Sequence, residues 1–192
     1  MRSDQIEFFM SCAACLNFSL AAKYHFVSVS TLSRGIDSLE EELGSKLFNR
    51  GYHGHELTEF GNGFFETCIE ARLNYEYFIR KWRPEPQETL IIGCKPHDGS
   101  FERLVTAYSR APAEYISSKP KVIFITEDRL IKCLEDGIIN LFLGEGSDAA
   151  DKMFTMPFCR SDKKQYIFIS RNKPDENSTG ILTKLSSLIK QF

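Results

Sequence analysis

Residues 17–58 contain the pattern that most constrains what this chain can fold into. Ser19 is a suitable N-cap for a short helix that carries Ala21–Ala22, and a turn follows at Val27–Ser28. Small alanine side chains let a second helix approach closely. Because Ser28 is in turn placed to cap another helix, the segment predicts two helices joined by a tight turn.

The second of these helices is amphipathic. Its apolar residues recur at spacings of four, three and four, and they are Leu32, Ile36, Leu39 and Leu43. The opposite face at its N-terminal end carries short hydroxyl side chains and one arginine: Ser30, Thr31, Ser33 and Arg34. Such residues suit a helix that enters a DNA major groove, and Gly44 ends the helix.

The residues after Gly44 predict a two-stranded wing. Residues 45–48 read as a short half-buried segment, 49–55 as a turn with two glycines, and 57–58 as renewed order. Arg50 is the best candidate for contact with a phosphate or the minor groove. His53 and His55 would suit a metal as an HxH pair, but a polar loop tip near the DNA backbone is the favoured interpretation.

An ordered set of residues in this stretch carries a family resemblance. The set is Phe18, Ala21–Ala22, Val27–Ser28, Leu32–Arg34, Ile36, Leu39–Gly44, Leu47–Phe48, Arg50, Leu57–Glu59 and Gly61. It resembles the winged helix-turn-helix of the LysR-type transcriptional regulators, densely over the first third of the chain and more thinly to about residue 145. The resemblance implies a prokaryotic regulator that binds double-stranded DNA through Ser28, Ser30, Thr31, Ser33, Arg34, Arg50, His53 and Thr58.

Three departures from the family bear on which sequence is read. Val29 and Ser30 stand where the family usually has glutamine and proline, Gly35 stands where a polar residue is common, and His53 stands where the wing often has arginine. The chain has therefore lost a usual base-reading amide and a wing cation. The family's half-site preference is not carried over to it.

Charge is balanced in this chain of 192 residues, whose formal net charge is −2. Acidic residues slightly outnumber basic ones even in residues 1–83. We expect Arg34, Lys46 and Arg50 to share a face while the run Glu40–Glu42 points into solvent. Non-specific affinity for DNA should be modest and salt-sensitive.

The cysteine pattern and the absence of an export signal favour a cytoplasmic protein with free thiols. Residues 4–16 predict a helix, and Cys12 and Cys15 form a CxxC inside it. A redox pair or half of a zinc site is the alternative to small packed residues, which we favour because no second pair exists at matching spacing. No apolar run approaches 18 residues, so no membrane span is expected.

Residues 59–83 predict a long helix that begins at the N-cap Thr58. A heptad spacing joins Phe64, Cys68, Ala71, Tyr75, Phe78 and Trp82. Such a seam predicts a partner helix, although a helix packed on its own domain would also be apolar. The resemblance implies a dimerising linker helix, hence a homodimer or a dimer of dimers. Two prolines make 84–88 a hinge.

Strands and helices alternate over residues 89–143. Apolar strands at 89–94, 121–126 and 138–143 enclose helices at 98–110 and 127–136, with a further strand at 165–170 and a helix at 181–192. This order predicts a parallel sheet covered on both faces. It resembles the first subdomain of the LysR effector domain, which is built like a periplasmic binding protein.

The predicted fold class is therefore α/β, with an α-rich winged helix-turn-helix over 1–58, a linker helix and hinge over 59–88, and one three-layer α/β subdomain over 89–192. A full family member has two such subdomains, so we expect an abbreviated effector domain. A half-site for a small-molecule effector is predicted at the carboxyl ends of the strands, at Lys95, His97, Ser100, Thr126 and Gly144. The alternatives are ordinary loop residues, a protein-interaction module, and a sensor whose cleft is completed across a dimer.

Enzymatic signatures are absent from the sequence. It has no phosphate-binding loop, no GxSxG, no paired carboxylates on a recognisable scaffold and no metal-ligand cluster. We expect neither catalysis nor a cofactor.

Overall fold

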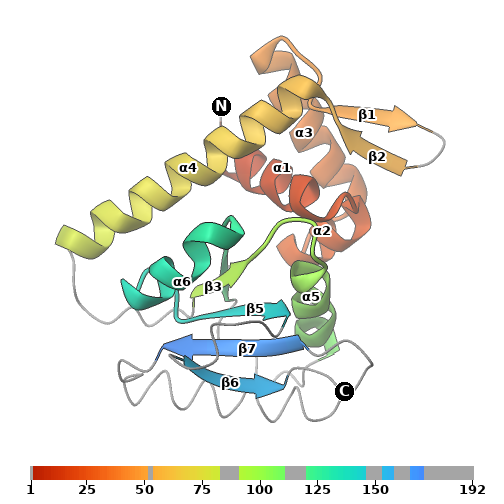
Figure 1. Ribbon diagram of the computed structural model, residues 1–192. Coiled ribbons are helices and arrows are strands. Elements are labelled where there is room, and N and C mark those ends of the chain that lie inside the picture. The colour runs from red at the N-terminus through yellow and green to blue at the C-terminus, as the bar shows by residue number, and fades with distance from the viewer. Residues whose placement is uncertain are drawn as a thin grey trace. The chain divides into compact units, whose positions relative to one another are not determined.

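The computed structural model describes residues 2–51, 54–82, 91–110, 120–145, 153–157 and 165–170 (Figure 1). The chain divides into two compact units, Met1–Arg72 and Leu73–Phe192. One long helix, α4 (Glu59–Trp82), runs through the point of division. The predicted hinge at 84–88, the helix at 181–192 and Cys159 lie outside the described residues.

The first unit is a helical domain with a two-stranded wing. Its helices are α1 (Ser3–Cys15), α2 (Phe18–His25) and α3 (Val29–Leu43), and its strands are β1 (Phe48–Gly51) and β2 (Gly54–Leu57). The strands pair antiparallel, with Arg50 opposite His55. Figure 1 shows the wing between α3 and the start of α4.

The helix boundaries follow from local capping. Ser28 caps α3 as predicted, because its hydroxyl oxygen accepts the Thr31 N–H at 3.1 Å. Gly44 ends α3 in the left-handed conformation (φ 70°), which glycine adopts without strain. The prediction of Ser19 as the cap of α2 was wrong. Asn17 caps that helix, and its side chain accepts the Leu20 N–H at 3.0 Å, so α2 begins earlier than expected.

Aromatic rings and small residues fill the core of the first unit. Phe9 is fully buried, with ring centroids 5.7 Å from Phe48 and 5.2 Å from Phe64. Ala13 and Ala21 are also fully buried, and they allow the close approach of α1 and α2 that their size predicted. Full burial of a Phe or Leu side chain stabilises the folded state by roughly 1.5–3 kcal/mol, so this core fixes the position of α3.

The second unit is α/β. Its elements after α4 are β3 (Ile91–Cys94), α5 (Ser100–Arg110), β4 (Lys121–Phe124), α6 (Glu127–Glu135), β5 (Leu141–Glu145), β6 (Met153–Pro157) and β7 (Gln165–Ser170). The sheet order is β4-β3-β5-β7-β6. The first three strands are parallel, as predicted. Strand β7 is antiparallel to β5 and to β6, so the complete sheet is mixed.

Helices α5 and α6 cover opposite faces of this sheet. A Cβ placed on Gly93 of β3 would lie 3.2 Å from Leu130 of α6. The ring of Phe124 in β4 lies 5.2 Å from that of Phe101 in α5. Gly93 and Ile123 are register partners and Phe124 is the next residue, so Gly93 and Phe124 face opposite sides. The three-layer prediction is therefore confirmed.

Among the described residues, no helix has the length and apolar character required to cross a membrane.

Candidate DNA-binding interface

The N-terminal turn of α3 presents a cluster of hydroxyl groups on an exposed surface. Ser28, Ser30 and Thr31 are all exposed. The Ser28 hydroxyl lies 2.8 Å from both the Ser30 and the Thr31 hydroxyl oxygens, and it also caps the helix. These bonds hold the three side chains in one arrangement close to the backbone, where a groove-binding helix carries its short donors and acceptors.

Arg34 lies one helical turn beyond Ser30 and is also exposed. Its Nε donates to the Ser30 carbonyl oxygen at 3.3 Å, which aligns the guanidinium with the helix surface. Leu32, Ile36 and Leu39 are fully buried on the opposite side. The structure thus brings Ser28, Ser30, Thr31 and Arg34 together, with Ser33 half-buried at the edge of their surface.

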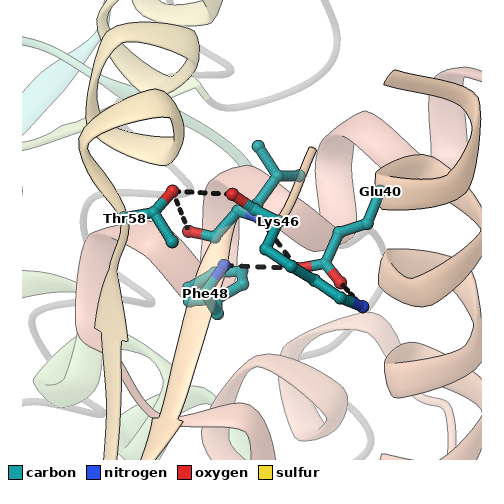
Figure 2. Close-up of polar contacts among 5 residues, drawn as sticks. Glu40, Lys46, Phe48 and Thr58 are labelled. Carbon is teal, nitrogen blue, oxygen red and sulfur yellow. Dashed lines mark hydrogen bonds and ion pairs between the residues drawn. The ribbon is translucent and has the colours of Figure 1, made fainter. Parts of the chain in front are cut away.

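The base of the wing is attached to α3 by a buried carboxylate (Figure 2). Glu40 is 3% exposed, and its Oε1 accepts the backbone N–H groups of Leu47 at 2.9 Å and Phe48 at 3.2 Å. Its Oε2 pairs with Lys46 Nζ at 2.7 Å. The expectation that Glu40 points into solvent with its acidic neighbours was therefore wrong, whereas Glu41 and Glu42 are exposed as expected.

The environment of Glu40 keeps this carboxyl ionised. Burial by itself would raise its pKa, but the hydrogen bonds from Lys46, Leu47 and Phe48 outweigh that effect and hold the pKa below the ordinary value. The carboxylate therefore acts as a charged acceptor for two backbone amides at the start of β1. Sequence analysis missed this role because Glu40 is adjacent to two solvent-exposed glutamates and resembles them in sequence.

Thr58 closes the other side of the wing (Figure 2). Its hydroxyl accepts the Gly61 N–H at 2.8 Å and donates to the Lys46 carbonyl at 2.7 Å, while its backbone N–H donates to the Leu47 carbonyl at 3.0 Å. The predicted N-cap of α4 is thus confirmed. The hydroxyl that was predicted to contact a phosphate is engaged within the chain.

The remaining wing candidates are only partly described. Arg50 lies in β1, and its side chain and the whole of His53 lie outside the described residues. The ring of His55 stacks on Phe18, with centroids 4.0 Å apart. His55 therefore contributes to the packing of β2 against α2. In the described parts of the chain, no three residues of the types His, Cys, Asp or Glu are grouped as a metal site would require.

Cys12 and Cys15 lie inside α1, and the described cysteines are free. Cys12 is fully buried, and burial raises the pKa of its thiol well above the ordinary value. The Cys15 thiol donates to the Ser11 carbonyl at 3.1 Å. The pair thus behaves as small packed residues in the helix, because a neutral buried thiol is a poor nucleophile and a poor metal ligand.

Helix α4 packs within the chain through a different face from the predicted seam. The buried residues are Gly61, Phe65, Ile69, Leu73 and Glu76. The predicted dimerisation residues Phe64 and Cys68 are half-buried, and Ala71, Tyr75, Phe78 and Trp82 are exposed. The three aromatic side chains are 56%, 59% and 66% exposed, so the alternative in which this seam packs on its own domain is wrong for them.

The C-terminal part of α4 is attached to the second unit by polar contacts. Glu76, which is 3% exposed, pairs with Lys121 of β4 at 2.6 Å. The Tyr77 hydroxyl donates to Asp136, after α6, at 2.9 Å. Together with the fully buried Leu73, these contacts make the last turns of α4 part of the α/β unit.

The predicted effector half-site lies at the carboxyl ends of β3, β4 and β5. Lys95 follows β3 and forms an ion pair with Glu127 at the start of α6, so its charge is compensated. Ser100 is buried, and its N–H donates to the Asp98 carboxylate at 2.7 Å. His97 has a positive φ of 61°, Thr126 precedes α6 as its N-cap residue, and Gly144 lies in β5 opposite Tyr166. Sequence analysis did not identify Asp98 and Glu127, whose roles depend on the loops that the sheet brings together.

Comparison with known proteins identifies the first unit. Residues 3–62 match the family described as bacterial regulatory helix-turn-helix protein, lysR family. The chain belongs to the LysR-type regulators. It is 33% identical over 88 residues to the HTH-type transcriptional activator IlvY of Haemophilus influenzae, covering 46% of this chain and 30% of that protein. It is 36% identical over 150 residues to the HTH-type transcriptional regulator TfdT of Cupriavidus pinatubonensis, covering 75% of this chain and 64% of that protein.

The matched part of this LysR-type chain thus spans less than two thirds of each of these relatives. Among solved structures, a chain of the Corynebacterium glutamicum OxyR C206S mutant, H2O2-bound, is similar with a TM-score of 0.43 and 23% identity, over 81% of this chain and 49% of that one.

Proposed function

We propose that this LysR-type chain is a homodimeric, sequence-specific regulator that binds double-stranded DNA in the cytoplasm through the N-terminal turn of α3. The observation that carries the proposal is the exposed surface of Ser28, Ser30, Thr31 and Arg34 above a fully buried Leu32 and its apolar neighbours. Short hydroxyls and a forked cation can contact base edges and phosphates. The wing, held to α3 by Glu40, supplies the backbone contacts.

Fluorescence anisotropy on duplex DNA from the chain's own upstream region tests DNA binding. We expect binding that survives excess random duplex, and Arg34→Ala to weaken specific binding by about 1–3 kcal/mol if the arginine makes a bidentate base contact. Arg34→Lys keeps the charge but loses the fork, and it should recover only part of that loss. Lys132→Ala removes an exposed charge from α6 and serves as the control. Equal displacement by random duplex contradicts the proposal.

The dimer is proposed to form through the exposed aromatic face of α4. Tyr75, Phe78 and Trp82 recur along the helix at heptad spacing and face solvent within one chain. Burying such a face against a second copy removes apolar area from water, and two copies place two α3 helices on two half-sites. The α/β unit is proposed as the regulatory part.

Sedimentation velocity tests this assembly. The native chain should sediment as a dimer, and Phe78→Asp should yield monomers because a carboxylate would be buried in the seam. Asn74→Asp adds the same charge at an exposed position of α4 outside the seam and should remain dimeric. A dimeric Phe78→Asp variant would place the interface elsewhere.

A further inference from the structure

We propose that Val29 is a specificity-determining residue that reads the C5-methyl group of a thymine in each half-site, an inference that rests on the DNA-binding function proposed above. Val29 is the first residue of α3, directly after the N-cap Ser28. Its side chain is 45% exposed on a helix turn whose other side chains are hydroxyls. It is therefore an apolar group within an otherwise polar candidate reading surface.

Neither packing nor helix formation explains a valine at this position. The core of the unit receives Leu32, Ile36 and Leu39 from α3, all fully buried, whereas Val29 remains substantially exposed. Valine is also a poorer helix former than alanine. An exposed β-branched residue in the first turn therefore contributes little to the stability of the free protein, which leaves contact with a ligand as its advantage.

The chemistry of the major groove identifies that ligand. Every base-pair edge there presents hydrogen-bond donors and acceptors, and the thymine C5-methyl is its apolar group. Valine has no hydrogen-bonding atom in its side chain, so a polar base edge placed against it would lose water without gaining a partner. Because valine strongly prefers one χ1 rotamer in a helix, its two methyl groups are already fixed in direction before binding.

The neighbouring side chains leave Val29 to make this contact. The Ser28 hydroxyl is held by Ser30, Thr31 and the helix cap. Arg34 lies one turn beyond Ser30 and donates back to it, whereas Ser33 lies one turn beyond Val29. The helix thus presents two adjacent ridges, one of valine and a small serine and one of serine and arginine. The first admits a methyl group closely, and the second suits a polar edge or a phosphate.

Substitution of deoxyuridine for thymidine tests the proposal, since uracil pairs with adenine and lacks only the C5-methyl. Duplexes are first enriched from a random-sequence pool by the full chain, and each thymidine is then replaced singly. At one thymidine in each half-site the native chain should bind about fourfold more weakly, the change expected for one buried methyl group. Val29→Ala should bind the two duplexes equally well, and Ile131→Ala, an exposed aliphatic residue on α6, should keep the fourfold difference.

The outcomes separate this inference from the function on which it rests. If no sequence is enriched, the proposed sequence-specific function fails and Val29 has nothing to read. If a sequence is enriched but contains no thymidine whose methyl group matters, the function stands and the role of Val29 is overturned. Equal sensitivity to deoxyuridine in the native chain and in Val29→Ala also overturns it, because the methyl group would then be read by another residue.

Discussion

Replacing Glu40 with alanine should release the base of the wing from α3. The substitution leaves the backbone N–H groups of Leu47 and Phe48, now 2.9 and 3.2 Å from a carboxylate oxygen, without this acceptor. Each buried donor left unsatisfied destabilises the fold by about 1–3 kcal/mol, so we expect a loss of about 2–5 kcal/mol in the free energy of unfolding. The pair with Lys46 adds little, because the lysine side chain is mostly exposed.

Urea unfolding followed by circular dichroism, with hydrogen exchange at individual amides, measures this effect. Glu41→Ala is the matched control, because Glu41 is the exposed neighbour in the same acidic run, and it should change the free energy of unfolding by less than about 0.5 kcal/mol. Faster exchange should concentrate at Leu47 and Phe48. A Glu40→Ala variant as stable as the native chain, with both amides still protected, would refute the reasoning.

The same carboxylate predicts a pH dependence. The pKa of Glu40 is lowered in the folded state, so the unfolded state takes up a proton at higher pH than the folded state does. Its contribution is therefore complete above the ordinary value of 4.5 and is lost as the pH falls through the lower folded pKa. Glu40→Gln should be about 1 kcal/mol less stable than the native chain at pH 7, and this difference should shrink below pH 4.5. A difference that stays constant with pH would contradict the assignment.

Three further substitutions test the packing. Gly61→Ala places a Cβ 2.1 Å from the Leu47 carbonyl oxygen, so we expect a loss of at least about 3 kcal/mol in urea unfolding, and a loss below 1 kcal/mol would contradict the close approach. Gly35→Ala places a Cβ 2.8 Å from the Phe8 ring and should destabilise the native chain by about 1 kcal/mol. In a Phe8→Leu background the same change should stabilise by up to about 1 kcal/mol through helix propensity, and an unchanged sign would refute the clash. Tyr77→Phe removes a hydrogen bond to a carboxylate and should lower the stability of the second unit by about 1 kcal/mol, whereas an unchanged midpoint in thermal unfolding would show that the bond adds nothing.

Much of the architecture followed from local signals in the sequence. The spacing of Leu32, Ile36 and Leu39 predicted the buried face of α3, and Ser28 and Gly44 marked its ends because capping depends on neighbouring residues alone. The strand at 165–170 was recognised by its apolar run. The exposed hydroxyls at the start of α3 were also predictable, since helical periodicity fixes which side chains lie opposite the apolar face.

Other features depended on which segments meet in space. Glu40 is chemically identical to Glu41 and Glu42, and only the approach of residues 47–48 makes it a buried acceptor. The heptad pattern of α4 did not show which face packs within the chain, because Phe65, Ile69 and Leu73 form an equally apolar stripe. The antiparallel insertion of β7 beside β5 likewise depends on long-range pairing that a strand's own residues do not specify.

The sequence by itself thus determined the elements, their caps and the residues exposed at the start of α3, since these depend on interactions within one helix or strand. The tertiary structure decided which charged groups are buried and which apolar face remains exposed. Lys95 shows the reason: its partner Glu127 is far away in sequence and becomes a neighbour because parallel strands β3 and β4 end side by side. Burial and pairing are properties of the assembled fold, and they determine which groups are engaged within the chain.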